Sequence, residues 1–306
     1  MFLVRGAKNG LIYLLVRGLL AVSRLVPGSW LVRLFEGLGR AGAHLARYER
    51  RRALRNLAAS ELRLEGALAR RVWSHALAHV GRSLGECLVL LRGGRQARAV
   101  REQITFSPGG IETLRGALAE GHGVVLTGAH FGNWELLVSA LAMHTEASQT
   151  QIHVLARPSY DPRFSFLLER LRARLGCRTI WVRGGRSHLR HCLGALSQGE
   201  VVALAADQPA PRGAESMAFL GRMAPTSMVA PSLAHKSGAP LLWVLSERQG
   251  GRHHIIIERI PVARDLSRKV SARQATAVLC ERLGEAVVRC PEQWLWSLDR
   301  WRENLT

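Results

Sequence analysis

Residues 124–141 read Val-Val-Leu-Thr-Gly-Ala-His-Phe-Gly-Asn-Trp-Glu-Leu-Leu-Val-Ser-Ala-Leu. The apolar run at 124–127 predicts a buried strand, and the run at 136–141 predicts the body of a helix. Between them, Gly132 allows the unusual backbone of a tight turn, and Asn133 is a residue type that caps helices well. A strand that leads directly into a helix is typical of an α/β fold.

His130 and Glu135 are the candidate catalytic pair in this stretch. Five residues on one continuous helix turn about 140° past a common face, so the two side chains meet only if His130 precedes the helix. Glu135 then accepts a hydrogen bond from one ring nitrogen and leaves the other as a proton acceptor. Backbone N–H groups at the helix start are suited to a developing oxyanion. The alternative is a satisfied core histidine beside a surface glutamate, and this motif alone leaves both open.

Alternating patterns downstream predict a mainly parallel or mixed sheet flanked by helices. The predicted strands are 123–127, 152–156, 179–182, 201–206, 241–246 and 254–260, and the predicted helices are 111–119, 133–143, 162–175, 187–197, 226–236 and 268–289. Ligands in such sheets bind beyond the carboxyl ends of the strands. His130, Arg157 and Asp207 each follow a predicted strand, so we expect them at one edge of the sheet.

The chain has 306 residues, enough for one substantial core, and a formal net charge of +20. So basic a surface favours anionic partners such as lipid head groups, an acidic carrier protein or nucleic acid. Five scattered cysteines and the histidines show no metal-like spacing, so we predict neither a metal nor a cofactor, and reduced thiols in a cytoplasmic compartment. The pair His253–His254 opens a predicted strand, and we expect it at the surface.

The first 60 residues carry eleven basic and two acidic side chains. Residues 11–26 are apolar but too short and too charged for a comfortable transmembrane helix. After Pro27-Gly28, a second predicted helix places Arg33, Arg40 and Arg47 at seven-residue spacing, with Leu34, Leu38, Ala41 and Leu45 on another side. Two such helices favour a monotopic membrane anchor, and the alternative is a core helix with solvated arginines. We therefore predict a helical, membrane-associating region at 1–105 and an α/β core at 106–306.

The run Gly-Ala-His-Phe-Gly-Asn-Trp-Glu resembles the signature of the bacterial late acyltransferases of lipid A biosynthesis, and mycobacterial phosphatidylinositol mannoside acyltransferases are similar. Further matches follow in family order: Arg157-Pro158, Asp207-Gln208, Phe219-Leu220-Gly221, Ala224-Pro225-Thr226, Leu233-Ala234 and the tail Pro291-Glu292-Gln293-Trp294-Leu295-Trp296. The resemblance implies a membrane-associated acyltransferase with an HX4E motif at the cytoplasmic face of the inner membrane. Its donor would be acyl carrier protein or acyl-coenzyme A, and its acceptor a lipid A precursor or another lipid head group.

On this hypothesis His130 removes the proton of the acceptor hydroxyl as that oxygen attacks the thioester, and Glu135 orients His130. Asn133, Arg157 and Asp207 are candidate substrate-binding residues. Arg157 would hold the thioester oxygen, a phosphate or Glu135, and Asp207 would position a base or an arginine. The rival classes are a nucleic-acid-binding protein, a hydrolase with water as acceptor, and an inert membrane scaffold. No helix-turn-helix, zinc-finger or RNP-type motif is apparent to support the first of these.

Overall fold

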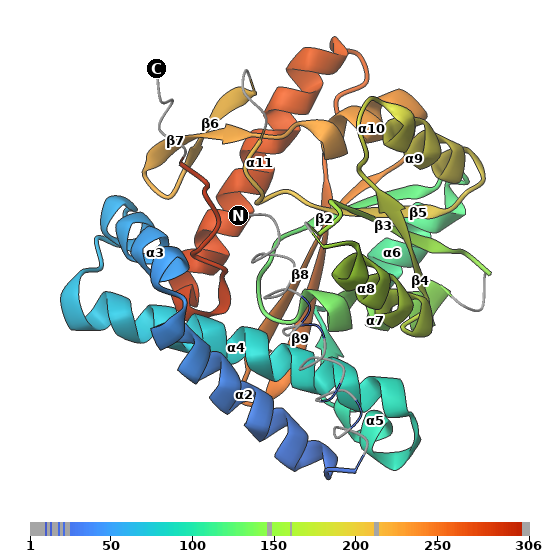
Figure 1. Cartoon of the computed structure of the whole chain (residues 1–306). Coiled ribbons are helices and arrows are strands. Elements are labelled where there is room, and N and C mark those ends of the chain that lie inside the picture. The colour runs from blue at the N-terminus through green and yellow to red at the C-terminus, as the bar shows by residue number, and fades with distance from the viewer. Residues whose placement is uncertain are drawn as a thin grey trace.

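The computed structural model describes residues 10, 13, 18, 21, 25–145, 149–159, 161–210 and 214–301. It is an α/β structure with a seven-stranded, mostly parallel central sheet flanked by helices, as the sequence predicts (Figure 1). The strand order is β1-β9-β8-β2-β5-β3-β4, and only β1 and β9 run against the others. The strands are β1 (Ile104–Phe106), β2 (Val124–Gly128), β3 (Ile152–Ala156), β4 (Cys177–Trp181), β5 (Val201–Ala205), β8 (Leu241–Gln249) and β9 (Arg252–Ile260).

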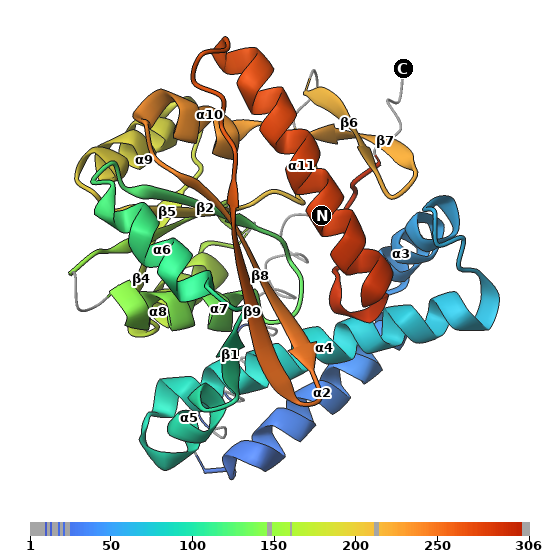
Figure 2. The same ribbon diagram turned by 180° about the vertical axis from the view of Figure 1, so that it is seen from behind.

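Strand β2 lies at the centre of the sheet and is buried on both faces. Val124 and Leu126 pack on the side of α6 (Gly110–Ala119) and α7 (Trp134–Thr145), whereas Val125 packs on the side of α9, α10 and α11. These last helices span Ser187–Ser197, Val229–Ser237 and Arg268–Arg289, and α8 (Pro162–Arg174) packs beside edge strand β4 (Figures 1 and 2). A strand covered on both faces reads as a continuous apolar run, which explains the 124–127 pattern.

The register between β2 and β5 brings their carboxyl ends level. Val124 pairs with Val201 and Gly128 pairs with Ala205, so the residues that follow the two strands leave the sheet side by side. A backbone hydrogen bond from Ala206 to Gly128 continues this pairing one residue beyond the ladder. The residues that follow β2 and β5 therefore lie beside each other at the carboxyl ends of two neighbouring inner strands.

Helices α2 (Gly28–Leu45), α3 (Arg47–Ala59), α4 (Gly66–Arg92) and α5 (Gly94–Arg101) precede the sheet. Helices α2 and α4 lie side by side along its lower end in Figure 1. Close packing requires glycine at the crossing, since a Cβ on Gly39 would lie 2.1 Å from the carbonyl oxygen of Leu77, and one on Gly81 would lie 2.1 Å from that of Phe35. No helix within the described residues is long and apolar enough to cross a bilayer.

Some predicted boundaries change. The helix predicted at 226–236 starts only at Val229, because Thr226 is the last residue of β7 (Arg222–Thr226), which forms a hairpin with β6 (Glu215–Phe219). Strand β1 runs across the boundary predicted between the N-terminal region (1–105) and the α/β core (106–306). The division into these two regions stays a prediction. The helix predicted over 11–26 lies largely outside the described residues.

Candidate active site

His130 lies two residues beyond β2, with Asp207 beside it beyond β5. The carboxylate of Asp207 engages His130 twice: Oδ1 lies 2.8 Å from ring Nδ1, and Oδ2 accepts the backbone N–H at 2.8 Å. The indole Nε1 of Trp294 donates to the same Oδ2 at 3.0 Å. Asp207 is fully buried, whereas the His130 side chain is 19% exposed. Because Nδ1 is held by the carboxylate, the Nε2 lone pair is available to accept a proton.

The charges of this pair reinforce each other. Burial alone would lower the pKa of His130, but the charge and hydrogen bond of Asp207 outweigh it, so the pKa lies above its ordinary value. Burial alone would raise the pKa of Asp207, but the charge and hydrogen bonds of His130 and the indole of Trp294 bring it below its ordinary value. Asp207 is thus ionised at neutral pH and would stabilise an imidazolium on His130.

The turn that carries His130 is fixed by the backbone of the C-terminal tail. Gly132 donates its N–H to the carbonyl of Gln293 at 2.9 Å, and Leu295 donates to the carbonyl of His130 at 3.2 Å. Gly132 has φ +58°, and a Cβ there would lie 1.8 Å from the carbonyl oxygen of Ser246. Only glycine therefore fits at this point, because both the backbone conformation and the close approach exclude a side chain.

Glu135 does not hold His130, contrary to the expected hydrogen bond. Its carboxylate forms a bidentate ion pair with Arg172 of α8, which donates from Nη2 to Oε1 at 2.7 Å and from Nε to Oε2 at 3.1 Å. The orienting hydrogen bond comes from Asp207 instead, because β5 neighbours β2 in the sheet and delivers its carboxylate directly beside the ring. Glu135 still lies close enough for its charge to raise the pKa of His130.

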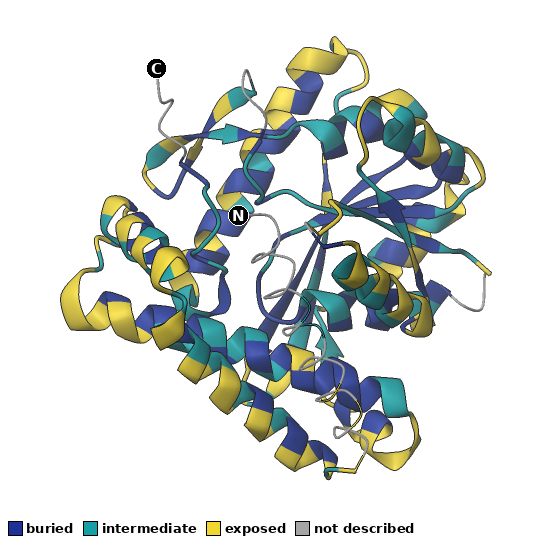
Figure 3. Ribbon diagram, in the orientation of Figure 1, coloured by how far each residue is buried: buried dark blue, intermediate teal, exposed yellow. Residues whose placement is uncertain are grey.

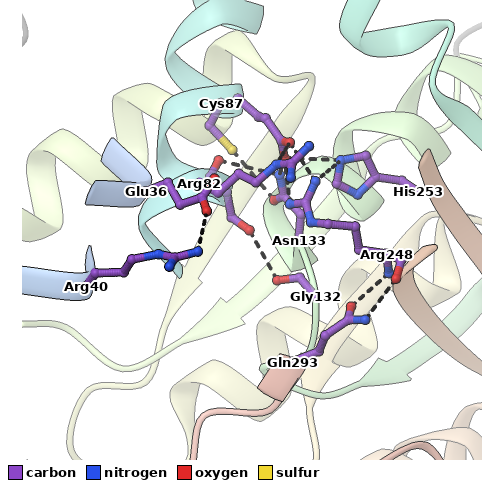
Figure 4. Close-up of polar contacts among 11 residues, drawn as sticks. Glu36, Arg40, Arg82, Cys87, Gly132, Asn133, Arg248, His253 and Gln293 are labelled. Carbon is purple, nitrogen blue, oxygen red and sulfur yellow. Dashed lines mark hydrogen bonds and ion pairs between the residues drawn. The ribbon is translucent and has the colours of Figure 1, made fainter. Parts of the chain in front are cut away.

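Asn133 caps α7, since its Oδ1 accepts the N–H of Leu136 at 3.0 Å, while its Nδ2 donates to Glu86 of α4 at 2.9 Å. These contacts belong to a buried cluster that also contains Arg248 of β8 and is drawn in Figure 4, where Asn133 and Arg248 are labelled. Arg248 forms a bidentate pair with Glu86, at 2.6 and 3.0 Å. With both its oxygen and its nitrogen engaged, and with 1% of its surface exposed, Asn133 is placed to hold the turn rather than to contact a substrate.

His253 belongs to the same cluster and corrects the surface position expected for it. Its side chain is fully buried, with Nε2 at 3.1 Å from both Glu86 Oε2 and Arg248 Nη1. Burial lowers the pKa of His253 despite the neighbouring carboxylate, so the ring is neutral at neutral pH. The pair His253–His254 lies near the start of β9, which begins at Arg252. Glu86 of α4 covers His253 there, and the strand pattern alone does not reveal this contact.

A cavity of about 190 Å³ opens beside His130. Four ionisable side chains line it, namely His130, Glu135, Arg157 and Arg172. Most of its remaining wall is apolar, including Leu126, Leu137, Val138, Val154, Leu155, Leu168, Leu204, Val244 and Leu245. A base at the polar end of an apolar cavity suits a substrate with a reactive polar group attached to a hydrocarbon chain.

Arg157 follows β3 and is exposed at this cavity. Of the partners expected for it, Glu135 is taken by Arg172. No ion pair of Arg157 is found within the described residues, so its charge is available to an anionic ligand. His130, Arg157 and Asp207 thus lie at the same edge of the sheet, as their positions after strands predict.

Comparison with known proteins identifies a family that matches nearly the whole chain. Residues 4–303 match the family described as bacterial lipid A biosynthesis acyltransferase. The chain belongs to this family. The resemblance inferred from the sequence motifs is thereby confirmed.

The chain is also similar to two curated proteins of lipid A biosynthesis. It is 29% identical over 203 residues to a lipid A biosynthesis palmitoleoyltransferase of Escherichia coli strain K12, and equally to a lipid A biosynthesis acyltransferase of Shigella flexneri. Each match covers 64% of this chain and 61% of the length of the relative.

Three residues of the site were not singled out from the sequence. Arg172 is one of several arginines in α8, and nothing in its spacing marks it. Trp294 lies in the tail motif Pro291–Trp296, whose place in the family order was a signal that this segment matters. Glu86 sits within a long helix, where a single carboxylate among apolar residues was the available signal.

Proposed function

We propose that the protein is a membrane-associated O-acyltransferase, which moves a fatty acyl chain from an acyl thioester to a hydroxyl of a lipid A precursor or related glycolipid. The observation that carries the proposal is the His130–Asp207 pair, with Nε2 of His130 free at the polar end of an apolar cavity. Family membership supports acyl transfer, and the apolar wall suits a hydrocarbon chain. The donor is acyl carrier protein or acyl-coenzyme A.

In this mechanism His130 Nε2 takes the proton of the acceptor hydroxyl as the hydroxyl oxygen bonds to the thioester carbonyl carbon. The carbonyl π-electrons move to its oxygen and form a tetrahedral oxyanion. The carbonyl re-forms as the C–S bond breaks, and the thiolate takes the proton from the His130 imidazolium. The products are an ester and a free thiol, and His130 is regenerated. Asp207 keeps the ring oriented and stabilises the imidazolium.

The other predicted site residues receive roles that fit their contacts. Arg157, exposed at the cavity, would bind a phosphate of the donor or the acceptor. Glu135 would hold Arg172 and add negative charge near His130. Asp207 would act through His130, because its carboxylate is buried among protein partners. Asn133 would act through the turn into α7, because its amide is also buried among protein partners.

The direct test uses the purified full chain with an acyl thioester and a lipid A precursor, and lipid mass spectrometry to detect the product. We expect an acceptor heavier by one acyl chain, together with release of free thiol. Release of free fatty acid whether or not the acceptor is present would favour the hydrolase alternative. Comparing the lipids of cells with and without this chain would identify the natural acceptor.

The pH dependence of kcat/KM should report the pKa of His130 as Asp207 sets it. The base must be neutral to accept a proton, and Asp207 raises the pKa of His130, so activity should fall as the pH drops through a value above the ordinary histidine pKa of about 6.5. Asp207→Asn removes the negative charge, so its acid limb should move to lower pH. Glu135→Gln, which acts on the ring only through space, should shift the limb less. A larger shift in the Glu135 variant would contradict the pairing.

Membrane association is supported by an apolar stripe on α2 and the start of α3, which consists of Trp30, Leu34, Leu38, Leu45 and Tyr48. These side chains are exposed, Trp30 by 66% and Leu45 by 81%, because α2 packs on the protein through Leu31, Phe35 and Ala43 instead. Figure 3 shows exposed residues along much of α2. Arg33, Arg40 and Arg47 are also exposed. An exposed apolar stripe beside arginines suits the anionic, cytoplasmic face of the inner membrane.

Removing this stripe should release the protein from vesicles. The triple change Leu34→Ser, Leu38→Ser and Leu45→Ser should weaken binding to phosphatidylglycerol-containing vesicles at least about tenfold, since burying one leucine contributes about 1.5–3 kcal/mol. Met223→Ser is a matched control, because Met223 is exposed and apolar but lies on β7. Cosedimentation measures both variants. Equal binding by the triple variant and the control would show that this stripe does not face the bilayer.

A further inference from the structure

Gln208 brings an unassigned amide to the cavity. It follows Asp207 in the motif Asp207-Gln208, and the mechanism above gives it no role. The residue is half-buried and lines the cavity, and its side chain has no hydrogen-bond partner within the described residues. A glutamine amide offers an oxygen that accepts and an NH₂ group that donates. A few polar groups in a mainly apolar cavity fix the orientation of a ligand, so this free amide points to a polar part of the substrate.

The strand order places Gln208 between the base and the free arginine of the cavity. His130 follows β2, Gln208 follows β5 and Arg157 follows β3, and these three strands are neighbours in the sheet in that order. All three residues line the cavity. On the other side of β2, strand β8 carries Ser246, whose side chain is fully buried. A substrate chain that starts at His130 and leaves the cavity at the exposed Arg157 therefore passes Gln208.

The pantetheine arm of an acyl thioester has matching chemistry along this path. Acyl carrier protein and coenzyme A carry the same arm, in which two methylene groups separate the sulfur from an amide and a phosphate lies at the far end. The span from the sulfur to the amide nitrogen is about 4 Å, and neighbouring strands lie about 4.8 Å apart. With the thioester at His130, this amide lies one strand away, at Gln208, and the phosphate lies beyond it on the side of Arg157.

We infer that Gln208 binds the donor through a hydrogen bond to the pantetheine amide nearest to the thioester. The inference rests on the proposed acyl transfer. It holds for acyl carrier protein and for coenzyme A, because it concerns a group that the two donors share. Gln208 thereby places the thioester carbonyl carbon beside Nε2 of His130, and it favours a donor that carries this amide over a thioester that lacks it.

The test pairs a change in the protein with a change in the donor. Gln208→Met keeps the length of the side chain and removes its amide. One donor is the dodecanoyl thioester of N-acetylcysteamine, which retains the pantetheine amide. The other is the dodecanoyl thioester of pentane-1-thiol, which has the same chain length with methylene groups in place of the amide. Steady-state transfer to the lipid A precursor gives kcat/KM for the wild type and the variant with each donor.

We expect the loss to depend on the donor. With the N-acetylcysteamine donor, Gln208→Met should lower kcat/KM by about three- to tenfold, the usual effect of losing one hydrogen bond. With the pentane-1-thiol donor, the variant should equal the wild type, because there is no amide for Gln208 to bind. Equal losses with both donors would overturn the inference, since Gln208 would then act on the acceptor or on the fold.

Gln198→Met is the matched control. Gln198 follows the last residue of α9, is exposed and does not line the cavity, so this change should alter kcat/KM with neither donor. Circular dichroism and urea unfolding check the fold of each variant. Should Gln208→Met not fold, Gln208→Asn keeps an amide but withdraws it by one methylene group, and the same donor-dependent loss is expected.

The natural donors extend the test to the complete arm. Dodecanoyl-coenzyme A and dodecanoyl-acyl carrier protein both contain the amide, so Gln208→Met should lose about three- to tenfold with whichever of the two the wild type accepts. A wild type that acylates no glycolipid from any of these thioesters would overturn the proposed function itself. An active wild type with an equally active Gln208→Met would overturn only the role of Gln208.

Discussion

A chain carrying His130→Ala is expected to fold and to lose acyl transfer by about 10²- to 10⁴-fold, the usual contribution of a positioned general base. Folding should survive because His130 is at the cavity rather than in the core, and because Asp207 keeps two of its donors, the N–H of residue 130 and the indole of Trp294. Without Nε2 of His130 no positioned base takes the proton of the acceptor hydroxyl. The hydroxyl oxygen must then attack the thioester carbonyl carbon while still protonated, or transfer its proton to water. The measurement is kcat/KM for transfer from the acyl thioester to the lipid A precursor.

The carboxylate that serves His130 can be identified in the same assay. Asp207→Asn should approach the loss seen with His130→Ala. The carboxylate accepts from the His130 ring, the His130 backbone N–H and the Trp294 indole, whereas an amide has one oxygen to accept with and an NH₂ group that only donates. Glu135→Gln should retain far more activity, since it breaks no hydrogen bond to the imidazole. If His130→Ala, with normal circular dichroism, kept more than about a tenth of wild-type activity, general-base catalysis by this histidine would be excluded.

The position of the site could be predicted from the sequence because it depends on local features. An apolar run buried on both faces marks β2, and a glycine followed by a capping asparagine marks the turn into α7. Residues that follow parallel strands reach the same edge of the sheet, which places His130, Arg157 and Asp207 together without knowledge of the strand order.

The partner of His130 could not be predicted in this way. Glu135 is near in sequence, but α7 carries it towards Arg172, while Asp207 is 77 residues away and reaches the ring only because β5 neighbours β2. Strand order is a property of the whole sheet, and no local pattern near residue 130 encodes it. The same holds for His253, whose burial depends on a helix about 170 residues earlier in the chain.

The second large effect is expected from Glu86, which links α4 to the turn at Asn133 and to β8. Burial alone would raise the pKa of Glu86, but hydrogen bonds and charges from His253 and Arg248 hold that pKa well below its usual range, so the carboxylate is ionised. Glu86→Ala leaves the Arg248 guanidinium buried without its counter-ion, and loss of one partner of a buried pair destabilises by about 3–5 kcal/mol. Urea unfolding should therefore show a free energy of unfolding lower by that amount.

Glu36→Ala provides the matched control, since Glu36 pairs with Arg40 on the solvent side of the same region (Figure 4). That pair is half exposed at the arginine and spaced four residues apart on α2, so its loss should cost no more than about 0.5 kcal/mol. The double change Glu86→Ala and Arg248→Ala should cost less than the sum of the two single changes, because removing both charges leaves neither unpaired. Additive losses would mean that the two residues stabilise the fold independently. The turn carrying His130 would then depend on Glu86 only through its hydrogen bond with Asn133.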